Sequence, residues 1–503
     1  MSCLLRPALL VLVLLAASTT PAGAQSTVLA PEILEPYNQG LQLIAEERYK
    51  EAIAVLRQSI EADGTFAPAY IATGDALKAL GDFQSAAAAY SQALNIDASA
   101  AAAFNGRAEC FMEMTPPDYN MALNDLTNAL GLDRGNAAVL SNLGHIFVNV
   151  AQDPQQGMDR LDEALSINPE DARAHRDRGM AHAQLREFDE SVADLRRAIE
   201  IDPADYENYS TLATIYLFQN KFTEASEALG QAITAYKPTK RGEPKIFITG
   251  YIFRADARLR LAEADAEGAA RTQALEGAIA DANAVVDAYE DRFPETGRAL
   301  YRRGRAERLL ERYSDAVDSL SKAIQQVPAG QSIEYLSDAY LFRGICWYHI
   351  GSYDLARGDF EQASSIGSGF QDPRVFLWIG YTHHAQGNYR QAIEAYSNAI
   401  SKAPSFALAH VNKGRAYMDL REYRKAIESF NHAIRHEPNV GDNYYNVGMA
   451  YIKLEDFEKA VEFLRLALKQ ENPQPKMYRA MATALRALGR NDLAAEYESQ
   501  AGG

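Results

Sequence analysis

Hydrophobic residues along most of the chain recur at every third or fourth position, in paired runs that short polar turns separate. That spacing places the apolar side chains on one face of an α-helix. In the clearest unit, a turn at Gly387-Asn388-Tyr389 precedes a run that starts at Gln391 and ends before Pro404. Since glycine and asparagine favour turns and proline cannot continue a helix, the pattern predicts two helices per unit, joined by a tight turn.

Small residues repeat at a strict interval of 34 positions near the C-terminus. They are Gly380, Gly414, Gly448 and Ala482. A glycine or alanine at a helix contact lets two helix axes approach to the short end of the usual range of about 8–10 Å. Larger residues recur at another fixed place in the unit, and we expect them to fill the space that the small residues leave. These are Tyr396, Phe430 and Leu464.

The same small position continues toward the N-terminus with looser spacing. Its members there are Gly344, Gly304, Ala213, Gly179, Gly144, Ala108, Gly74 and Gly40. The long interval from Ala213 to Gly304 predicts one degenerate unit that carries inserted residues. A helical bundle whose alanines reflect only helix propensity would not keep a fixed period, because propensity sets composition and not spacing.

On these residues the chain resembles the tetratricopeptide repeat family, most fully at Phe376 to Pro404 and at Leu408 to Pro438. The resemblance covers about residues 33–501. It implies an all-α fold, a right-handed superhelical α-solenoid of about 12–13 helix-turn-helix repeats. It also implies that one stripe of each first helix faces a concave groove, where a partner would bind.

The domain organisation follows from the weak units in the middle of the chain. We expect an N-terminal lobe over residues 33–237 and a C-terminal lobe over residues 297–503. Residues 238–296 between them combine a basic loop with the degenerate repeat and its insertion. Each lobe exceeds the roughly three repeats that a solenoid needs for stability.

The first 24 residues read as a cleaved signal peptide, followed by a linker over residues 25–32. Arg6 precedes an apolar run, and Ala22 and Ala24 supply the small residues of a cleavage site. The alternative is a membrane anchor, but the run is shorter than the roughly 20 residues that span a bilayer, and no comparable run follows. We therefore expect export to a periplasmic or extracellular location, with no transmembrane segment in the mature chain.

Composition and charge narrow the function further. The 503 residues include 50 basic and 67 acidic side chains, a net charge of −17. This sign disfavours a nucleic-acid partner. Three cysteines form no metal-binding pattern, and no Walker loop, HExxH or GxSxG motif occurs. His432 and His436 lie four residues apart without an adjacent third ligand, so no metal, cofactor or catalytic residue is expected.

A stripe of arginines is the strongest candidate for partner binding. On one helix its members would fall within about 80 degrees of arc, at about 100 degrees per residue. They are Arg298, Tyr301, Arg305, Arg308 and Arg312, with Arg302 beside them. Guanidinium groups grip carboxylate or phosphate with two hydrogen bonds, so the stripe favours an acidic or carboxylate-ended protein or peptide. The alternative is neutralisation by Glu307, Glu311 and acids of adjoining units such as Asp338.

Two further groups of polar residues are candidates. The resemblance implies that asparagines and basic residues of adjacent units hold a peptide's terminal carboxylate, and the match to that pattern is partial. The residues are Asn412, Arg415, Asn446, Lys476 and Arg479 in the C-terminal lobe, and Asn142, Arg173 and Arg176 in the N-terminal lobe. The alternative is that they decorate a solvated surface.

Aromatic residues lie on or beside the groove-facing stripe of neighbouring repeats, at Tyr348, Trp378, Tyr381 and His384. Such rings suit contact with a peptide or a sugar, but the packing of one repeat on the next also buries rings. The leading hypothesis is an exported non-catalytic scaffold that binds an extended peptide or a protein tail in a concave groove. The alternatives are a structural or self-associating subunit of a cell-envelope assembly and, more distantly, an enzyme with an unrecognised site. The sequence leaves the oligomeric state open.

Overall fold

The chain is helical throughout the part that this computed structural model describes, residues 30–238, 247–264, 267–289, 294–328 and 333–502. That part contains 26 α-helices, one short 3-10 helix and no strand. The first helices are α1 (Pro31–Ala45), α2 (Tyr49–Ala62), α3 (Ala67–Ala79), α4 (Phe83–Ile96), α5 (Ala101–Glu113), α6 (Tyr119–Leu132), α7 (Ala137–Asn149), α8 (Pro154–Ile167) and α9 (Ala172–Gln184).

The remaining helices follow in the same alternation. They are α10 (Phe188–Ile201), α11 (Tyr206–Phe218), α12 (Phe222–Ala235), α13 (Ile248–Ala264), α14 (Gly268–Tyr289), α15 (Pro294–Leu309), α16 (Tyr313–Gln325), α17 (Leu336–Ile350), α18 (Tyr353–Ser365), the 3-10 helix η1 (Gly367–Gln371), α19 (Pro373–Ala385), α20 (Tyr389–Lys402), α21 (Ala407–Asp419), α22 (Tyr423–His436), α23 (Gly441–Lys453), α24 (Phe457–Leu468), α25 (Pro475–Ala487) and α26 (Asn491–Gly502). They confirm the predicted all-α array of about 12–13 helix-turn-helix repeats.

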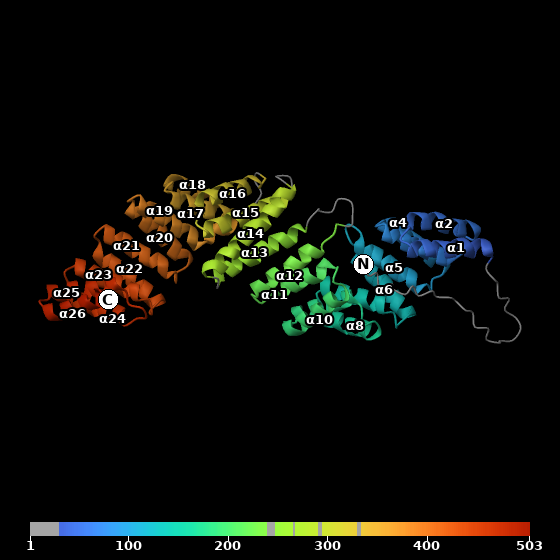
Figure 1. Ribbon diagram of the computed structural model, residues 1–503, viewed down its shortest axis with the longest axis horizontal. Helices are drawn as coiled ribbons and strands as arrows, with labels where there is room; N and C mark the ends of the chain where they lie inside the picture. The colour runs from blue at the N-terminus through green and yellow to red at the C-terminus, as the bar shows by residue number, and fades with distance from the viewer. Residues whose placement is uncertain (1–29, 239–246, 265–266, 290–293, 329–332, 503) are drawn as a thin grey trace. The chain divides into compact units, whose positions relative to one another are not determined.

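The chain divides into two compact units, residues 1–181 and residues 182–503. Within each unit the helices follow one another in chain order (Figure 1). The two helices of a hairpin pack together, as α15 does with α16, and the second helix packs on the first helix of the next hairpin, as α16 does with α17. First helices also contact one another, for example α15 with α17 and α17 with α19. The predicted lobes, which meet near residues 238–296, stay a prediction.

The small residues lie where the two helices of a hairpin come closest. A Cβ atom added at Gly414 would stand 2.5 Å from Cε1 of Phe430, and one at Gly344 would stand 2.6 Å from Cε1 of Phe360. Both rings are buried. The large residue therefore fills the space that the glycine leaves, as the spacing predicts. A methyl group on the glycine would not fit against the ring.

The turn between the helices of a hairpin contains one residue in the left-handed region. Gly387 has a φ of 78°, in the turn that its sequence predicts. Other repeats place a residue with a side chain there: Glu311 at 61°, Arg421 at 60° and Glu455 at 59°. A side chain in this conformation costs roughly 1–2 kcal/mol, so packing of the hairpin holds these turns in place.

The degenerate unit forms the longest hairpin in the second unit. α13 has 17 residues and α14 has 22, against 13 residues in α11 and 14 in α12. Much of the predicted insertion therefore lengthens two helices. The predicted basic loop lies mostly outside the described residues.

The N-terminal helix begins at Pro31, two residues inside the segment predicted as a linker. Proline suits the first turn of a helix because its fixed φ matches and its missing N–H has no partner there anyway. The predicted signal peptide, residues 1–24, lies outside the described residues. In the helices that are described, none combines the length and the apolar character that a bilayer crossing requires.

Candidate functional site

The arginines predicted for the stripe lie mainly on α15. Together with Arg302 beside them, and without Tyr301, they are called the arginine stripe from here on: Arg298, Arg302, Arg305, Arg308 and Arg312. The helix ends at Leu309, because Glu311 adopts a positive φ and opens the turn into α16. The sequence predicts that Arg312 continues the helix face, and this prediction is wrong. Arg312 is the N-cap of α16. Four arginines of the stripe remain on α15.

The two ends of the stripe form exposed ion pairs. The Nη2 atom of Arg298 lies 3.1 Å from a carboxylate oxygen of Glu334. Arg312 pairs with Glu276, to which its Nη1 also donates a hydrogen bond of 3.3 Å. Exposed pairs of this kind contribute about 0–1 kcal/mol. These two arginines are held loosely, and a competing anion displaces such contacts at little cost.

The middle of the stripe faces acids of α13. Arg305 donates to both carboxylate oxygens of Glu263, at 2.8 and 3.0 Å, and lies 3.8 Å from Asp256. Arg302 lies 3.6 Å from the same Asp256, which also pairs with Arg260 at 3.4 Å. The side chains of Arg302 and Arg305 are only 16% and 17% exposed. One carboxylate thus serves three guanidinium groups.

Arg308 differs from the rest of the stripe because, among the described residues, no acid forms an ion pair with it. Its guanidinium carbon lies 4.6 Å from the centroid of the Phe342 ring, and that of Arg305 lies 5.9 Å from the same ring. The Nε atoms of Arg302, Arg305 and Arg308 are buried without hydrogen-bond partners. Burial lowers the pKa of Arg308 from its ordinary value. The three guanidinium groups of the middle of the stripe therefore outnumber the two carboxylates that face them, those of Asp256 and Glu263.

Other predicted members of the site have structural roles. Tyr301 is 7% exposed and belongs to the hydrophobic core, and burial raises its pKa to about 12. Glu307, expected to neutralise the stripe, accepts a hydrogen bond of 2.6 Å from Ser319 instead. Burial raises the pKa of Glu307. Asp338 pairs with Arg374 at 3.1 Å. Neutralisation comes instead from acids that the sequence analysis did not single out: Asp256, Glu263, Glu276 and Glu334.

Next to the stripe, three rings form an aromatic ladder (Tyr348, Trp378 and Tyr381) on α17 and α19. The ring centroids of Tyr348 and Trp378 lie 5.3 Å apart, and those of Trp378 and Tyr381 lie 5.1 Å apart, both edge to face. Each ring is half-buried. The ladder therefore packs repeat on repeat and keeps part of each ring at the surface. His384 contacts the Tyr389 ring instead, with centroids 5.2 Å apart, and its Nε2 lies 2.9 Å from a carboxylate oxygen of Asp419.

The C-terminal polar candidates are mostly engaged with neighbours. Asn412 is buried and donates hydrogen bonds to the Tyr381 hydroxyl at 3.1 Å and to the Leu408 carbonyl at 2.7 Å. Lys476 pairs with Asp442 at 2.8 Å. Asn446 differs, since its buried Nδ2 has no hydrogen-bond partner in the described structure.

Two C-terminal arginines complete this group. Arg415 reaches the Asn412 side-chain oxygen only at 3.5 Å. Arg479, on α25, is exposed.

The N-terminal polar candidates form a network within the first unit. Asn142 is buried and donates to Asn105 and to Glu109, each at 3.1 Å. Arg173 donates to the Asn142 oxygen at 3.3 Å. Arg176 lies on α9, half-buried. The hydrogen bonds of Asn142 are satisfied inside the protein, so a ligand would have to replace them.

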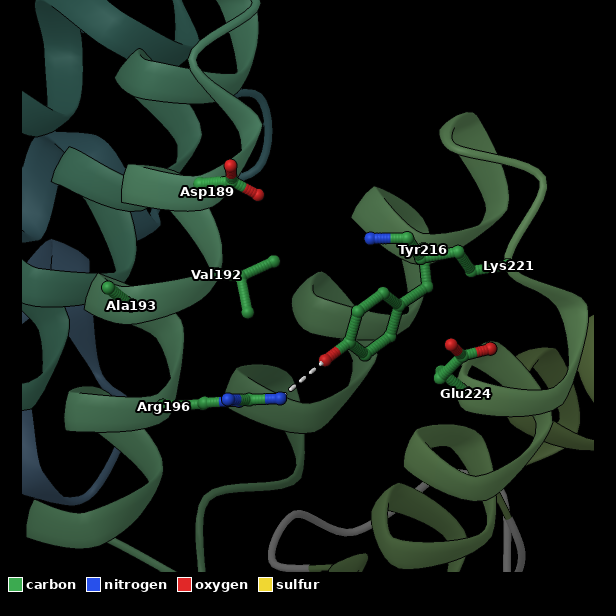
Figure 2. A pocket seen from close by; sticks show the side chains of 7 residues that line it. All are labelled: Asp189, Val192, Ala193, Arg196, Tyr216, Lys221 and Glu224. Atoms are coloured by element: carbon green, nitrogen blue, oxygen red, sulfur yellow. Dashed lines mark hydrogen bonds between the residues drawn. The ribbon is translucent and has the colours of Figure 1, made fainter.

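A pocket that the sequence analysis missed lies among α10, α11 and α12 (Figure 2). Its volume is about 330 Å³, and seven residues line it: Asp189, Val192, Ala193, Arg196, Tyr216, Lys221 and Glu224. Arg196 donates a hydrogen bond of 3.2 Å to the Tyr216 hydroxyl. The four charged residues balance in sign, and most of the lining is exposed. Nothing in the sequence distinguishes these charges from those of any solvated helix face.

Nucleophilic and metal chemistry find little support in the described residues. Cys110 and Cys346 are free and buried, and burial raises the pKa of each thiol to about 12. No group of three or more histidine, cysteine or acidic residues is arranged there to hold a metal ion. His432 and His436 stack against a third histidine, His410, with ring centroids 5.1 and 5.8 Å away.

Comparison with known proteins gives a consistent family match. The sequence pattern described as tetratricopeptide repeat matches more than half of the chain. The matched segments are residues 37–101, 71–113, 150–206, 269–330, 379–439 and 411–475.

Two characterised relatives are similar over short segments. Tetratricopeptide repeat protein 13 of Homo sapiens is 30% identical over 108 residues, which are 22% of this chain and 12% of that protein. Small glutamine-rich tetratricopeptide repeat-containing protein 2 of Saccharomyces cerevisiae is 35% identical over 77 residues, 15% of this chain and 22% of that protein. The chain thus spans less than a quarter of either relative.

Solved structures resemble the chain at low identity. A tetratricopeptide repeat protein from Parabacteroides merdae is 17% identical, with a TM-score of 0.40, over 55% of this chain and 99% of that one. MamA is 21% identical, with a TM-score of 0.31, over 34% of this chain and 91% of that one. YrrB, described as having an unusual peptide-binding site, is 25% identical, with a TM-score of 0.29, over 36% of this chain and 91% of that one.

Proposed function

Because this chain belongs to the tetratricopeptide repeat family, we propose that it is a non-catalytic scaffold that binds an extended peptide or a protein tail. The binding face is formed by the first helices of the second unit, from α15 onward. Repeat arrays of this kind are protein-interaction scaffolds, and their stacked units offer an extended surface instead of a closed active site.

The observation that carries the proposal is the surplus of guanidinium charge at Arg302, Arg305 and Arg308. Arg308 has no acidic partner among the described residues, although the whole chain carries a net charge of −17. A carboxylate from a partner would complete the set, so we propose an acidic or carboxylate-ended ligand. Two charge-assisted hydrogen bonds contribute about 3–6 kcal/mol before ordering costs, whereas micromolar binding needs about 8 kcal/mol. Further contacts must contribute the rest.

A comparison of captured partners tests the proposal. The exported fraction of the native host is passed over the immobilised mature chain and over a variant with Arg305→Glu and Arg308→Glu. The matched control is Arg357→Glu, because Arg357 lies on the second helix α18 and pairs locally with Asp354 at 3.1 Å. We expect the double variant to lose acidic partners that the control retains. An unchanged partner set would remove the stripe from the function.

Export is part of the same proposal, and the N-terminal sequence supports it. Residues 1–24 combine Arg6, an apolar run and a small-residue cleavage site. We expect the mature chain to begin at Gln25 in the periplasm or outside the cell. Intact-mass measurement of the chain purified from its own host checks this, since cleavage would remove the mass of residues 1–24 and retention of the leader would not.

A further inference from the structure

We propose that the arginine stripe and the aromatic ladder form one continuous surface, which reads an acidic residue and an aromatic residue at a fixed separation in an extended partner. The separation is about six to seven residues, from the spacing of the helices, the positions of the residues along them and the rise of an extended chain. This inference rests on the proposed function, and it adds what the partner must contain beyond negative charge.

The first support is the position of each residue within its repeat. Arg302, Phe342 and Trp378 each stand two residues before the small residue of their unit. Arg308 and Tyr348 each stand four residues after it. Equivalent positions in successive repeats lie on the same face, so the first set forms a row across α15, α17 and α19, and the second set forms a row across α15 and α17.

The second support is direct contact along those rows. The Phe342 ring receives the Arg308 guanidinium at 4.6 Å and lies 6.2 Å from the Tyr301 ring. Phe342 and Tyr301 belong to one core cluster, against which Tyr348 and Trp378 also pack. The cationic and aromatic parts therefore share one hydrophobic base.

The surface is already organised for binding. Asp256 and Glu263 fix the guanidinium groups of Arg302 and Arg305, and edge-to-face packing fixes the rings of Tyr348 and Trp378. A ligand would therefore not bear the cost of ordering these side chains, which is about 0.5–1.5 kcal/mol for each flexible one. Arginine and aromatic side chains together are typical of residues that dominate binding energy.

The separation follows from geometry. Neighbouring first helices pack at about 8–10 Å, so α15 and α19 lie about 16–20 Å apart with α17 between them. An extended chain advances about 3.3 Å per residue. Arg308 and Trp378 also stand six positions apart within their repeats, which adds about 9 Å along the helix and makes the separation about 18–22 Å. A partner whose carboxylate meets Arg308 therefore brings its sixth or seventh residue onward to Trp378. This holds for either direction of the partner chain.

The test uses synthetic peptides and the protein's own fluorescence. The chain contains two tryptophans, Trp347 and Trp378. Trp347 packs against Val317 and Cys346. In a Trp347→Phe background, Trp378 is therefore the only indole, and it lies within the proposed surface. The peptides contain two glutamates and one phenylalanine separated by five Gly/Ser residues, in both orders. Controls are the same residues with the glutamates next to the phenylalanine, and a glutamate peptide without phenylalanine.

We expect one of the two spaced peptides to bind at least about fivefold more tightly than either control, and to shift Trp378 emission. Arg308→Gln and Trp378→Leu should each remove that advantage, whereas Arg357→Gln should keep it. Circular dichroism checks that each variant is folded. Arg308→Lys retains the positive charge but loses the planar guanidinium group, so it should give an intermediate affinity.

The outcomes separate the two proposals. If glutamate peptides bind through Arg308 but neither phenylalanine nor spacing matters, the further inference is wrong and the proposed function stands. If no acidic peptide binds to the folded protein, both fail.

Discussion

Arg343 and Asp359 join the two helices of one hairpin through two parallel hydrogen bonds. The Nε atom of Arg343 donates to Oδ2 at 2.8 Å, and Nη2 donates to Oδ1 at 2.7 Å. Arg107 and Asp125 repeat this geometry in the first unit, at 2.7 and 2.8 Å. In both hairpins the arginine directly precedes the small residue of the repeat. The pairing is therefore a recurrent link between first and second helices.

Asp359→Asn should destabilise the second unit by about 3 kcal/mol, because it leaves the guanidinium of Arg343 without a compensating charge at a site mostly shielded from water. Urea unfolding followed by circular dichroism measures the change. The control is Asp354→Asn on the same helix, at a side chain that is 79% exposed, with an expected effect within about 0.5 kcal/mol. Equal effects of the two variants would contradict the structural role of the pair.

Gly414→Ala should destabilise the hairpin of α21 and α22 by about 1–3 kcal/mol, because the new Cβ would stand 2.5 Å from the Phe430 ring. Gly358, on α18, provides the matched control, since a Cβ there meets nothing within 4 Å. Gly358→Ala should stabilise by about 0.5–1 kcal/mol through helix propensity. Thermal unfolding of the two variants side by side checks the opposite signs.

Arg421→Gly should stabilise the same hairpin by about 0.5–1 kcal/mol, because Arg421 is exposed and has a φ of 60° in the turn. Gly387 occupies the equivalent turn of the preceding repeat with a φ of 78°. Gly387→Ala should destabilise by about 1 kcal/mol. A loss of stability in Arg421→Gly would show that the arginine side chain contributes more than the turn conformation costs.

Acid should loosen the hairpin of α21 and α22 through His410 and His432, two of its three stacked histidines. His410 is 7% exposed and donates from Nε2 to the Pro404 carbonyl at 3.0 Å. Burial lowers the pKa of His410 and of His432. The charged residues around these rings are Lys413, Arg435 and Glu428, with His436 as the third ring.

The sign of this pH dependence follows from the lowered pKa values. In the unfolded chain His410 and His432 take up protons near pH 6.5, before they do so in the folded chain. The stability from the neutral rings is therefore complete above that pH and falls as the pH drops through 6.5 toward the lower folded values. Hydrogen exchange of α21 and α22 at pH 7.5 and at pH 5.5 measures the loss.

His410→Asn is the matched variant for this effect. Asn443 stands at a similar place in the next repeat and donates to the carbonyl of Glu437, six residues earlier, as His410 does to Pro404. We expect the variant to keep that hydrogen bond and to show a weaker acid effect on exchange. An unchanged acid effect would assign the loosening to other groups.

The sequence predicts the hairpins well because a fixed period constrains both helices of each unit at once. A glycine such as Gly414 must lie opposite a ring such as Phe430 for the two helices to pack. The spacing of the two residues in the chain therefore predicts how the helices contact each other. The order of the repeats in space also follows, since each hairpin packs on its neighbour.

The acids opposite the arginine stripe could not be predicted, because they lie where the period is lost. Asp256 and Glu263 belong to α13, within the long interval before Gly304, and without a repeat position nothing places them opposite Arg302 and Arg305. The end of α15 at Leu309 could not be predicted for a local reason. Glu311 adopts a conformation that favours glycine, so the chain gives no turn signal there.

Cys110 and Cys346 are both fully buried, and they belong to different units of the chain. Each thiol is out of reach of a bulky alkylating reagent as long as its own helices stay together. Among the described residues, each unit therefore contains one buried cysteine whose modification reports the opening of that unit. The rate at which a maleimide modifies each cysteine, resolved by peptide mass, would time the opening of each unit separately without any engineered label.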